Sequence, residues 1–178
     1  LWGSEHSLYQ RLGFELCGTQ MRIPLSGLRL PPELDLEGGL RQGFSPAVFE
    51  LLKKRDGGLA LENADFPWFA AHRNVSWYWV GTPDRASACV AIGRGIDLHN
   101  LVHEWHGDPG VLSGLLGRIR GLHADASLLT SLERLERSGL KAPTDAGIEY
   151  LCMARVLDPS AVVRAYGDAG AVSYTHLR

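Results

Sequence analysis

The sequence lacks the features that mark membrane proteins and nucleic-acid-binding proteins. No apolar run approaches the ~18 residues of a membrane-spanning helix, and no basic stretch followed by an apolar one opens the chain as in a secretory signal. The formal net charge is −2 at pH 7, which gives no electrostatic attraction for nucleic acid or an anionic membrane. We therefore expect a cytoplasmic protein without nucleic-acid or membrane partners.

Cysteine is also scarce, with three residues in the whole chain. Cys17, Cys89 and Cys152 are far apart in the sequence, and each lies in an apolar, strand-like context. An odd and scattered set favours buried core thiols in a reducing compartment over structural disulfides.

What the chain does contain is ordinary globular sequence. Its 178 residues are 45% hydrophobic and 21% charged, which is close to average usage and enough for a sizeable core. This length predicts one domain, or at most two small ones. Prolines and glycines interrupt residues 24–46 without a sustained period, so this stretch is the clearest break in the chain.

Apolar spacing and turn residues predict an alternation of helices and strands. Helices are expected from the cap Ser45 to the stop at Gly57 and Gly58, at 64–72, from Asp108 to 122, from the cap Thr130 to Gly139, and after Asp158. Strands are expected at 76–80, 88–92, 96–105, 128–129 and 149–157. The order predicts an α/β fold with helices around a mixed sheet, antiparallel early and parallel where helices intervene.

A short helix and a strand are also expected at the start of the chain. Ser4 can cap this helix, and Gly13 can end it because glycine enters the left-handed conformation without penalty. Phe14 then opens an alternating, strand-like run. Tyr9 stands on the last turn, where one interpretation is that it only packs, as an amphipathic side chain at a helix end.

The residues Tyr9-Gln10-Arg11-Leu12-Gly13-Phe14 resemble the YxxLGF segment of the GNAT superfamily, the acyl-CoA-dependent N-acyltransferases. In that family the segment joins the fourth helix to the sixth strand, late in the domain. The resemblance implies that Tyr9 is the general acid that protonates the departing thiolate of coenzyme A. A phenol of ordinary pKa ~10 is a suitable donor to such a thiolate.

Residues 135–140 repeat part of this pattern, with an arginine and a glycine in register and an apolar residue after the glycine. Together with the order of elements, this indicates an internal duplication in which Leu135 replaces Tyr9. The family binds pyrophosphate with a Q/R-x-x-G-x-G/A loop at a helix start. Here the matching junction carries Asp108 and Pro109, a negative charge and a missing N–H, so it predicts no acyl-CoA site.

Two further groups of residues are candidate sites. His99, His103, Glu104 and His106 lie within eight residues, but their order is not a zinc-protease pattern. Since residues 96–105 read as a strand, His99 and His103 should share one face with Trp105, and we predict no metal site. Four tryptophans are either core or the lining of an acceptor groove: Trp68, Trp77, Trp79 and Trp105.

We therefore expect a GNAT-like mixed sheet flanked by helices, preceded by the terminal helix–strand piece of a first GNAT domain. Residues 1–23 are assigned to that first, catalytic domain, 24–43 to a connecting segment, and 44–166 to a second, degenerate GNAT-like domain. Residues 167–178 form a tail, in which 172–178 resemble a translated sequencing adapter and are excluded as non-native.

The resemblance implies part of an N-acetyltransferase that moves an acetyl group from acetyl-CoA to an amine of a small molecule or protein. The fragment alone is expected to be inactive, because its phosphate loop would lie upstream of Leu1, and cofactor-binding residues stay unknown. The alternative from another class is a non-catalytic GNAT-like interaction or scaffold domain in which Tyr9 only packs. The sequence specifies neither the acceptor amine nor whether the chain forms a homo-oligomer.

Overall fold

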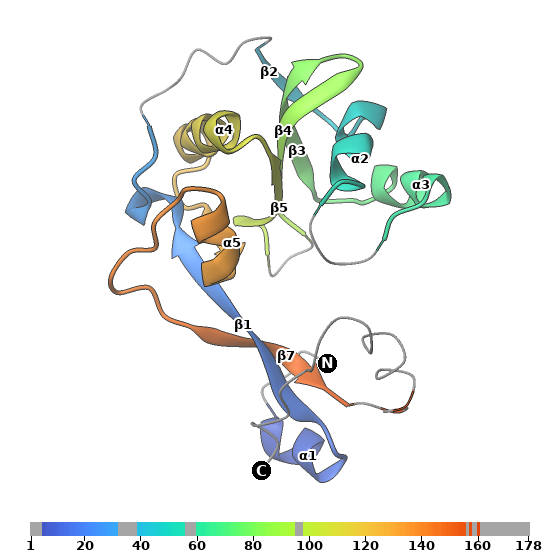
Figure 1. The fold of residues 1–178 in the computed structure, drawn as a ribbon, viewed down its shortest axis with the longest axis vertical. Coiled ribbons are helices and arrows are strands. Elements are labelled where there is room, and N and C mark those ends of the chain that lie inside the picture. The colour runs from blue at the N-terminus through green and yellow to red at the C-terminus, as the bar shows by residue number, and fades with distance from the viewer. Residues whose placement is uncertain are drawn as a thin grey trace. The chain divides into compact units, whose positions relative to one another are not determined.

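The computed structural model describes residues 5–31, 39–55, 60–94, 98–155, 157 and 160. The chain forms two compact units, one of residues 1–19 with 150–178 and the other of residues 20–149. Seven strands form one sheet in the order β2-β3-β4-β5-β6-β1-β7 (Figure 1). The domain boundaries expected from the sequence remain a prediction.

The centre of the larger unit is an antiparallel meander of three strands, as expected. It consists of β3 (Ser76–Thr82), β4 (Arg85–Ile92) and β5 (Leu101–Gly107). The short strand β2 (Leu40–Gln42) pairs with β3 at the edge, inside the segment for which the sequence predicted no regular structure. β6 (Ser127–Thr130) pairs with β5 in parallel, as a strand reached through a helix should.

Helices lie on both faces of this sheet (Figure 1). α2 (Pro46–Leu52) and α3 (Phe66–Ala70), with the 3₁₀ turn Asn63–Asp65 before α3, pack on the face that carries Trp77, Trp79, Cys89 and Ala91. α4 (Pro109–Leu122) packs on the other face through Leu112, Leu115, Leu116 and Ile119. No helix in the described part of the chain is long and apolar enough to cross a bilayer.

Local caps begin two of these helices as the sequence predicts. The Ser45 hydroxyl accepts a hydrogen bond from the Val48 backbone N–H at 3.3 Å, and Asp108 caps α4 in a similar way. α5 (Leu132–Arg137) differs from the expectation, because its cap is Ser131 and not Thr130. The Ser131 hydroxyl accepts from the Arg134 N–H, whereas the Thr130 hydroxyl donates to the Ser131 carbonyl.

A strand from the N-terminal segment completes the sheet beside β6. β1 (Glu15–Pro24) is longer than the sequence predicted, and its residues Met21–Pro24 pair antiparallel with Thr130–Ser127. The 3₁₀ turn Leu25–Gly27 follows and buries Leu25. The boundary expected at residue 23 therefore falls inside a paired strand.

The smaller unit contains α1 (His6–Arg11), the first half of β1 and most of β7 (Glu149–Ala154). Glu5, not Ser4, is the N-cap of α1, and Ser4 lies outside the described residues. The Arg155 guanidinium donates a hydrogen bond to the Leu12 carbonyl at 2.8 Å. The final helix expected after Asp158 lies almost wholly outside the described residues.

The cysteines correct the interpretation drawn from their spacing. Cys89 is fully buried, as expected, but Cys17 and Cys152 are only half-buried. Their sulfur atoms lie 3.3 Å apart although 135 residues separate them in sequence. Sequence distance was a poor guide because neighbouring strands of a sheet can come from opposite ends of a chain.

Truncating Leu135 tests the core beneath α5. Leu135 has 0% exposure and packs in the core under α4, so Leu135→Ala should lower the free energy of unfolding by about 2–5 kcal/mol. Leu132 on the same helix is 44% exposed, so Leu132→Ala should change it by no more than about 0.5 kcal/mol. Urea denaturation of both variants measures the difference, and equal effects would contradict the packing.

Candidate functional site

The junction between α1 and β1 has a defined hydrogen-bonded geometry. Gly13 has φ +78°, and its N–H donates to the Gln10 carbonyl at 2.9 Å. The Phe14 N–H donates to the Tyr9 carbonyl at 3.1 Å. These two bonds form a Schellman motif, which requires a left-handed residue at the position of Gly13. The helix stop predicted at Gly13 is thus confirmed.

The same motif fixes the ring of Tyr9. A Schellman motif brings the side chains of its first and last residues together, and here the Tyr9 and Phe14 rings meet edge-on at 6.1 Å between centroids. Tyr9 is half-buried on this short helix. The spacing of Tyr, Gly and Phe in the motif therefore has a structural cause, and the catalytic role of Tyr9 stays a prediction.

The junction after α5 has the same geometry in the larger unit. The Gly139 N–H donates to the Glu136 carbonyl at 2.9 Å, and the Leu140 N–H donates to the Leu135 carbonyl at 3.1 Å. Gly139 has φ +70°. Residues 9–14 and 135–140, the two segments with the repeated pattern, therefore end their helices in the same backbone conformation. They differ at the first residue, where a fully buried Leu135 takes the place of Tyr9.

In the larger unit, β5 and β6 part shortly after they meet. Their parallel pairing covers only Leu101 with Ser127 and Val102 with Leu128, although β5 continues to Gly107 and β6 to Thr130. Beyond that point the buried Trp105 indole N–H donates to the Leu129 carbonyl at 3.1 Å. A side chain of β5 thus replaces the lost backbone bonds to β6.

Arg134 of α5 packs against Trp105 at the point where β5 and β6 part. Its guanidinium lies over the Trp105 ring, 4.3 Å from the centroid, and donates to the Trp105 carbonyl. Its Nη2 also lies 3.1 Å from His106 Nε2. The ends of the two diverging strands are therefore joined by an indole and a guanidinium that bind each other.

A buried charged cluster continues from this bridge. Glu104 accepts a hydrogen bond from His106 Nε2 at 2.9 Å and pairs with Arg55 Nη1 at 3.3 Å. Burial alone would raise the pKa of the Glu104 carboxyl, but the hydrogen bond from His106 and the charges of Arg55 and Arg134 hold the pKa below its ordinary value. Glu104 is therefore ionised at neutral pH.

His106 is held neutral in the same cluster. Burial lowers the pKa of His106 first, and the positive charge of Arg134 lowers it further against the opposing pull of Glu104. A neutral ring can donate from Nε2 to Glu104 and accept from Arg134 at Nδ1, which lies 3.4 Å from Nη2. This tautomer uses both ring nitrogens within the protein.

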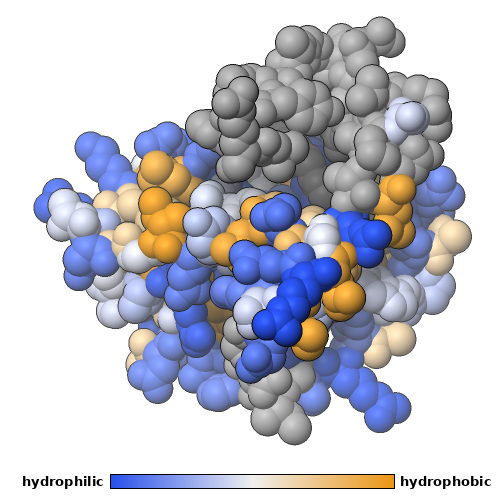
Figure 2. All heavy atoms as spheres, turned by 90° about the horizontal axis from the view of Figure 1, so that it is seen from below, coloured by the Kyte–Doolittle hydropathy of each residue, from blue (hydrophilic) through white to orange (hydrophobic). Residues whose placement is uncertain are grey.

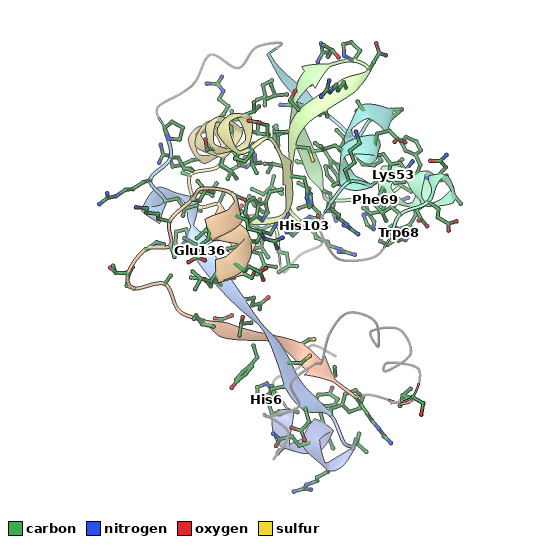
Figure 3. The ribbon with its side chains drawn as sticks, in the orientation of Figure 1. His6, Lys53, Trp68, Phe69, His103 and Glu136 are labelled. Carbon is green, nitrogen blue, oxygen red and sulfur yellow. The ribbon has the colours of Figure 1, made fainter. Side chains whose placement is uncertain are left out.

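The expected faces of the histidine segment need correction. Ala91 pairs with Glu104 and Ile92 with Val102, so His103 is the extra residue of a β-bulge and Val102 shares the core with Trp105. His99 lies in the turn before β5 and not in the strand. The His103 imidazole, drawn in Figure 3, contacts the Gly93 carbonyl at 3.0 Å. Among the described residues no three metal-ligating side chains gather.

An aspartate of the chain itself occupies the free backbone N–H groups at the start of α4. Asp108 Oδ1 accepts from the N–H groups of Gly110 at 3.0 Å and Val111 at 3.2 Å. These are the donors that a helix start offers to an anion, and Pro109 supplies none. A phosphate at this position would have to displace a carboxylate that belongs to the chain.

Three of the four tryptophans considered for an acceptor groove belong to the core. Trp77, Trp79 and Trp105 are at most 5% exposed, whereas Trp68 of α3, labelled in Figure 3, is 56% exposed. The Trp68 ring meets the His72 ring edge-on, with 4.1 Å between centroids. Apolar side chains on the face drawn in Figure 2 are interspersed with hydrophilic ones. The core interpretation thus holds for all but Trp68.

Solved structures share this fold. A conserved protein from Enterococcus faecalis V583, described as a probable N-acyltransferase, matches with a TM-score of 0.53 at 14% identity, over 86% of this chain and 43% of that one. A GCN5-related N-acetyltransferase from Kribbella flavida matches at 0.52 and 14%, over 84% and 41%. No protein-family model and no curated protein matches the sequence. The fold is GNAT-like, and the chain spans less than half the length of these structures.

The buried histidine predicts a pH dependence of stability. Because the folded-state pKa of His106 is lowered, the unfolded chain binds the proton first, and stability is lost as the pH falls below about 6.5. His106→Gln removes this proton and keeps a donor for Glu104. Its unfolding free energy should fall less than that of the unsubstituted protein between pH 7.5 and 5.5, by up to ~1.4 kcal/mol per pH unit. Urea midpoints at several pH values measure this, and parallel profiles would contradict it.

Proposed function

We propose that this chain is the C-terminal part of a tandem GNAT acyltransferase that transfers an acetyl group from acetyl-CoA to an amine. Two glycine-terminated junctions with the same hydrogen bonds, at Tyr9 and at Leu135, are the observation that carries the proposal. The fold supports it, as does the length of the matching structures, of which the chain spans less than half. The first junction is assigned to a catalytic domain and the second to a degenerate copy.

Tyr9 is the proposed general acid of the first domain. The amine attacks the acetyl carbonyl, the bond from carbon to sulfur breaks, and the phenol supplies the proton that the leaving thiolate takes up. The motif suits this role because it holds the Tyr9 ring against Phe14 at a fixed helix end. Acetyl-CoA would supply the acyl group as a co-substrate of the longer protein.

The second copy is proposed to bind no acyl-CoA. Asp108 already accepts from the N–H groups at the start of α4, where a pyrophosphate would sit in this family. Trp105 and Arg134 join β5 to β6 where the strands part. Leu135 has no proton to donate, so this copy has neither the acid nor the open backbone donors.

The alternative from another class is a non-catalytic interaction or scaffold domain. The observation that favours it is that Asp108 occupies the backbone donors at the start of α4 and that the Trp105 indole bonds to the Leu129 carbonyl between β5 and β6. In that case Tyr9 only packs on Phe14. Release of coenzyme A by the longer protein separates the two proposals, and substitution of Tyr9 then tests the acid.

Tyr9→Phe in the longer protein keeps the ring and its contact with Phe14 but removes the acidic proton. If Tyr9 is the acid, kcat should fall by about 10²–10⁴-fold, the usual contribution of general acid catalysis. KM for acetyl-CoA should change little, because the phosphates and pantetheine dominate binding. Release of free coenzyme A thiol measures the rate.

Tyr78→Phe is the matched control, since it removes a hydroxyl that bonds to His123 at 2.9 Å within the second copy. It should cost about 1 kcal/mol of stability and leave kcat unchanged. A Tyr9→Phe variant that keeps full kcat across the pH range would show that Tyr9 is not the acid. An unsubstituted longer protein that releases no free coenzyme A would support the scaffold instead.

The chain by itself should show no saturable affinity for acetyl-CoA. The reason is that Asp108 occupies the backbone donors of α4. Titration calorimetry with acetyl-CoA up to about 1 mM should give only heats of dilution, where 1 mM corresponds to about 4.1 kcal/mol of binding free energy. A micromolar dissociation constant would show that the second copy still works.

A further inference from the structure

We propose that Cys17 and Cys152 form a reversible disulfide that braces the α1–β1 junction against β7. The two sulfur atoms lie 3.3 Å apart, at hydrogen-bond distance between thiols. Cys17 lies in β1 and Cys152 in β7, which are neighbours in the sheet. Bond formation needs the sulfurs to close to ~2.05 Å, a movement of about an ångström that side-chain rotation can supply. The inference is independent of the proposed function.

The pair is placed where a reagent can reach it. Both cysteines are half-buried, so their sulfurs are not sealed in a core. Cys89 provides the contrast, because it has 0% exposure and burial raises the pKa of its thiol to about 12. A thiol must be ionised and accessible to exchange, so Cys89 should stay inert while the pair reacts.

The bond would act on the segment that carries Tyr9. Cys17 follows the Gly13 cap by four residues, and the smaller unit already ties this region to the end of β7 through the bond from Arg155 to the Leu12 carbonyl. A covalent link at Cys152 would add a second tie three residues before Arg155. Leu12 and Cys17, on either side of Gly13, would then both be tied to the segment from Cys152 to Arg155.

The chemistry is thiol–disulfide exchange with a low-molecular-weight disulfide, such as oxidised glutathione. One protein thiolate attacks the glutathione disulfide, forms a mixed disulfide and releases one glutathione thiolate. The second protein thiolate then attacks the protein sulfur of that mixed disulfide and releases the other glutathione. Two protein thiols are oxidised to one disulfide, and one oxidised glutathione is reduced to two molecules of the thiol.

The hydrogen bond between the two thiols sets the pH at which this occurs. The hydrogen bond from Cys152 and, after it, burial raise the pKa of the Cys17 thiol. The thiolate of Cys17 is therefore less populated at neutral pH than that of a free cysteine. Exchange should accelerate as the pH is raised from 7 towards 9.

The test uses the whole chain, treated with oxidised glutathione, quenched in acid and alkylated under denaturing conditions. We expect the mass to fall by two hydrogens, alkylation at Cys89 alone, and a peptide that links Cys17 to Cys152. A loop of this length should raise Tm by about 5–10 °C, and dithiothreitol should reverse the change. Three alkylated thiols after oxidation would overturn the proposal, and so would a linked peptide without any change in Tm.

Single-residue variants provide the controls. Cys89→Ala should form the linked peptide as before, whereas Cys17→Ser and Cys152→Ser should each keep a free thiol or a bound glutathione and gain no Tm. Disulfide-linked dimers of the unsubstituted chain on a non-reducing gel, in place of the internal link, would also overturn the proposal.

Discussion

The parallel pairing of β5 with β6 ends after two residue pairs, and much of the larger unit is organised around the place where the strands part. Separating paired strands leaves backbone groups without partners, and a buried group in that state costs about 1–3 kcal/mol. The chain meets this cost with the Trp105 indole, which donates to the Leu129 carbonyl. The Arg134 guanidinium lies over this indole and also contacts His106, which is hydrogen-bonded to Glu104.

The two glycine-terminated junctions have the same backbone conformation but differ in the side chain that they place at its first position. At Gly13 and at Gly139 the same pair of hydrogen bonds ends a six-residue helix and turns the chain. The backbone requires glycine because of the left-handed φ, but it leaves the first residue of the motif unconstrained. A half-buried tyrosine at that position adds a polar group to the junction, whereas the fully buried Leu135 adds only packing energy.

The features that the sequence predicted correctly depend on near neighbours. Ser45, Asp108 and Gly13 act within four residues of themselves, and the apolar spacing of α4 reflects the side of the helix that packs on the sheet. Such signals are readable because the interacting groups lie in one short window. Thr130 was expected as the cap of α5 in place of its neighbour Ser131 because both residue types can cap a helix and the two positions are adjacent.

The features that the sequence did not predict depend on distant partners. β1 lies beside β6 although about a hundred residues separate them, and nothing in either segment specifies the other. The bulge at His103 follows from the register against β4, which simple alternation cannot reveal. The approach of Cys17 to Cys152 and the bridge from Trp105 to Leu129 have the same non-local origin.

At two places in the larger unit, polar groups that could bind a ligand are satisfied by bonds within the chain. A site that awaits an anion must leave backbone donors directed at solvent, and that arrangement contributes nothing to stability until the ligand arrives. Asp108 converts two such donors into a helix cap, which is typically worth 0.5–2 kcal/mol to the fold, and Trp105 does the equivalent between β5 and β6. A ligand at either place would first have to outweigh a bond that the chain already makes. If the larger unit is the degenerate copy that we propose, these two bonds stabilise it at the places where a ligand would otherwise bind.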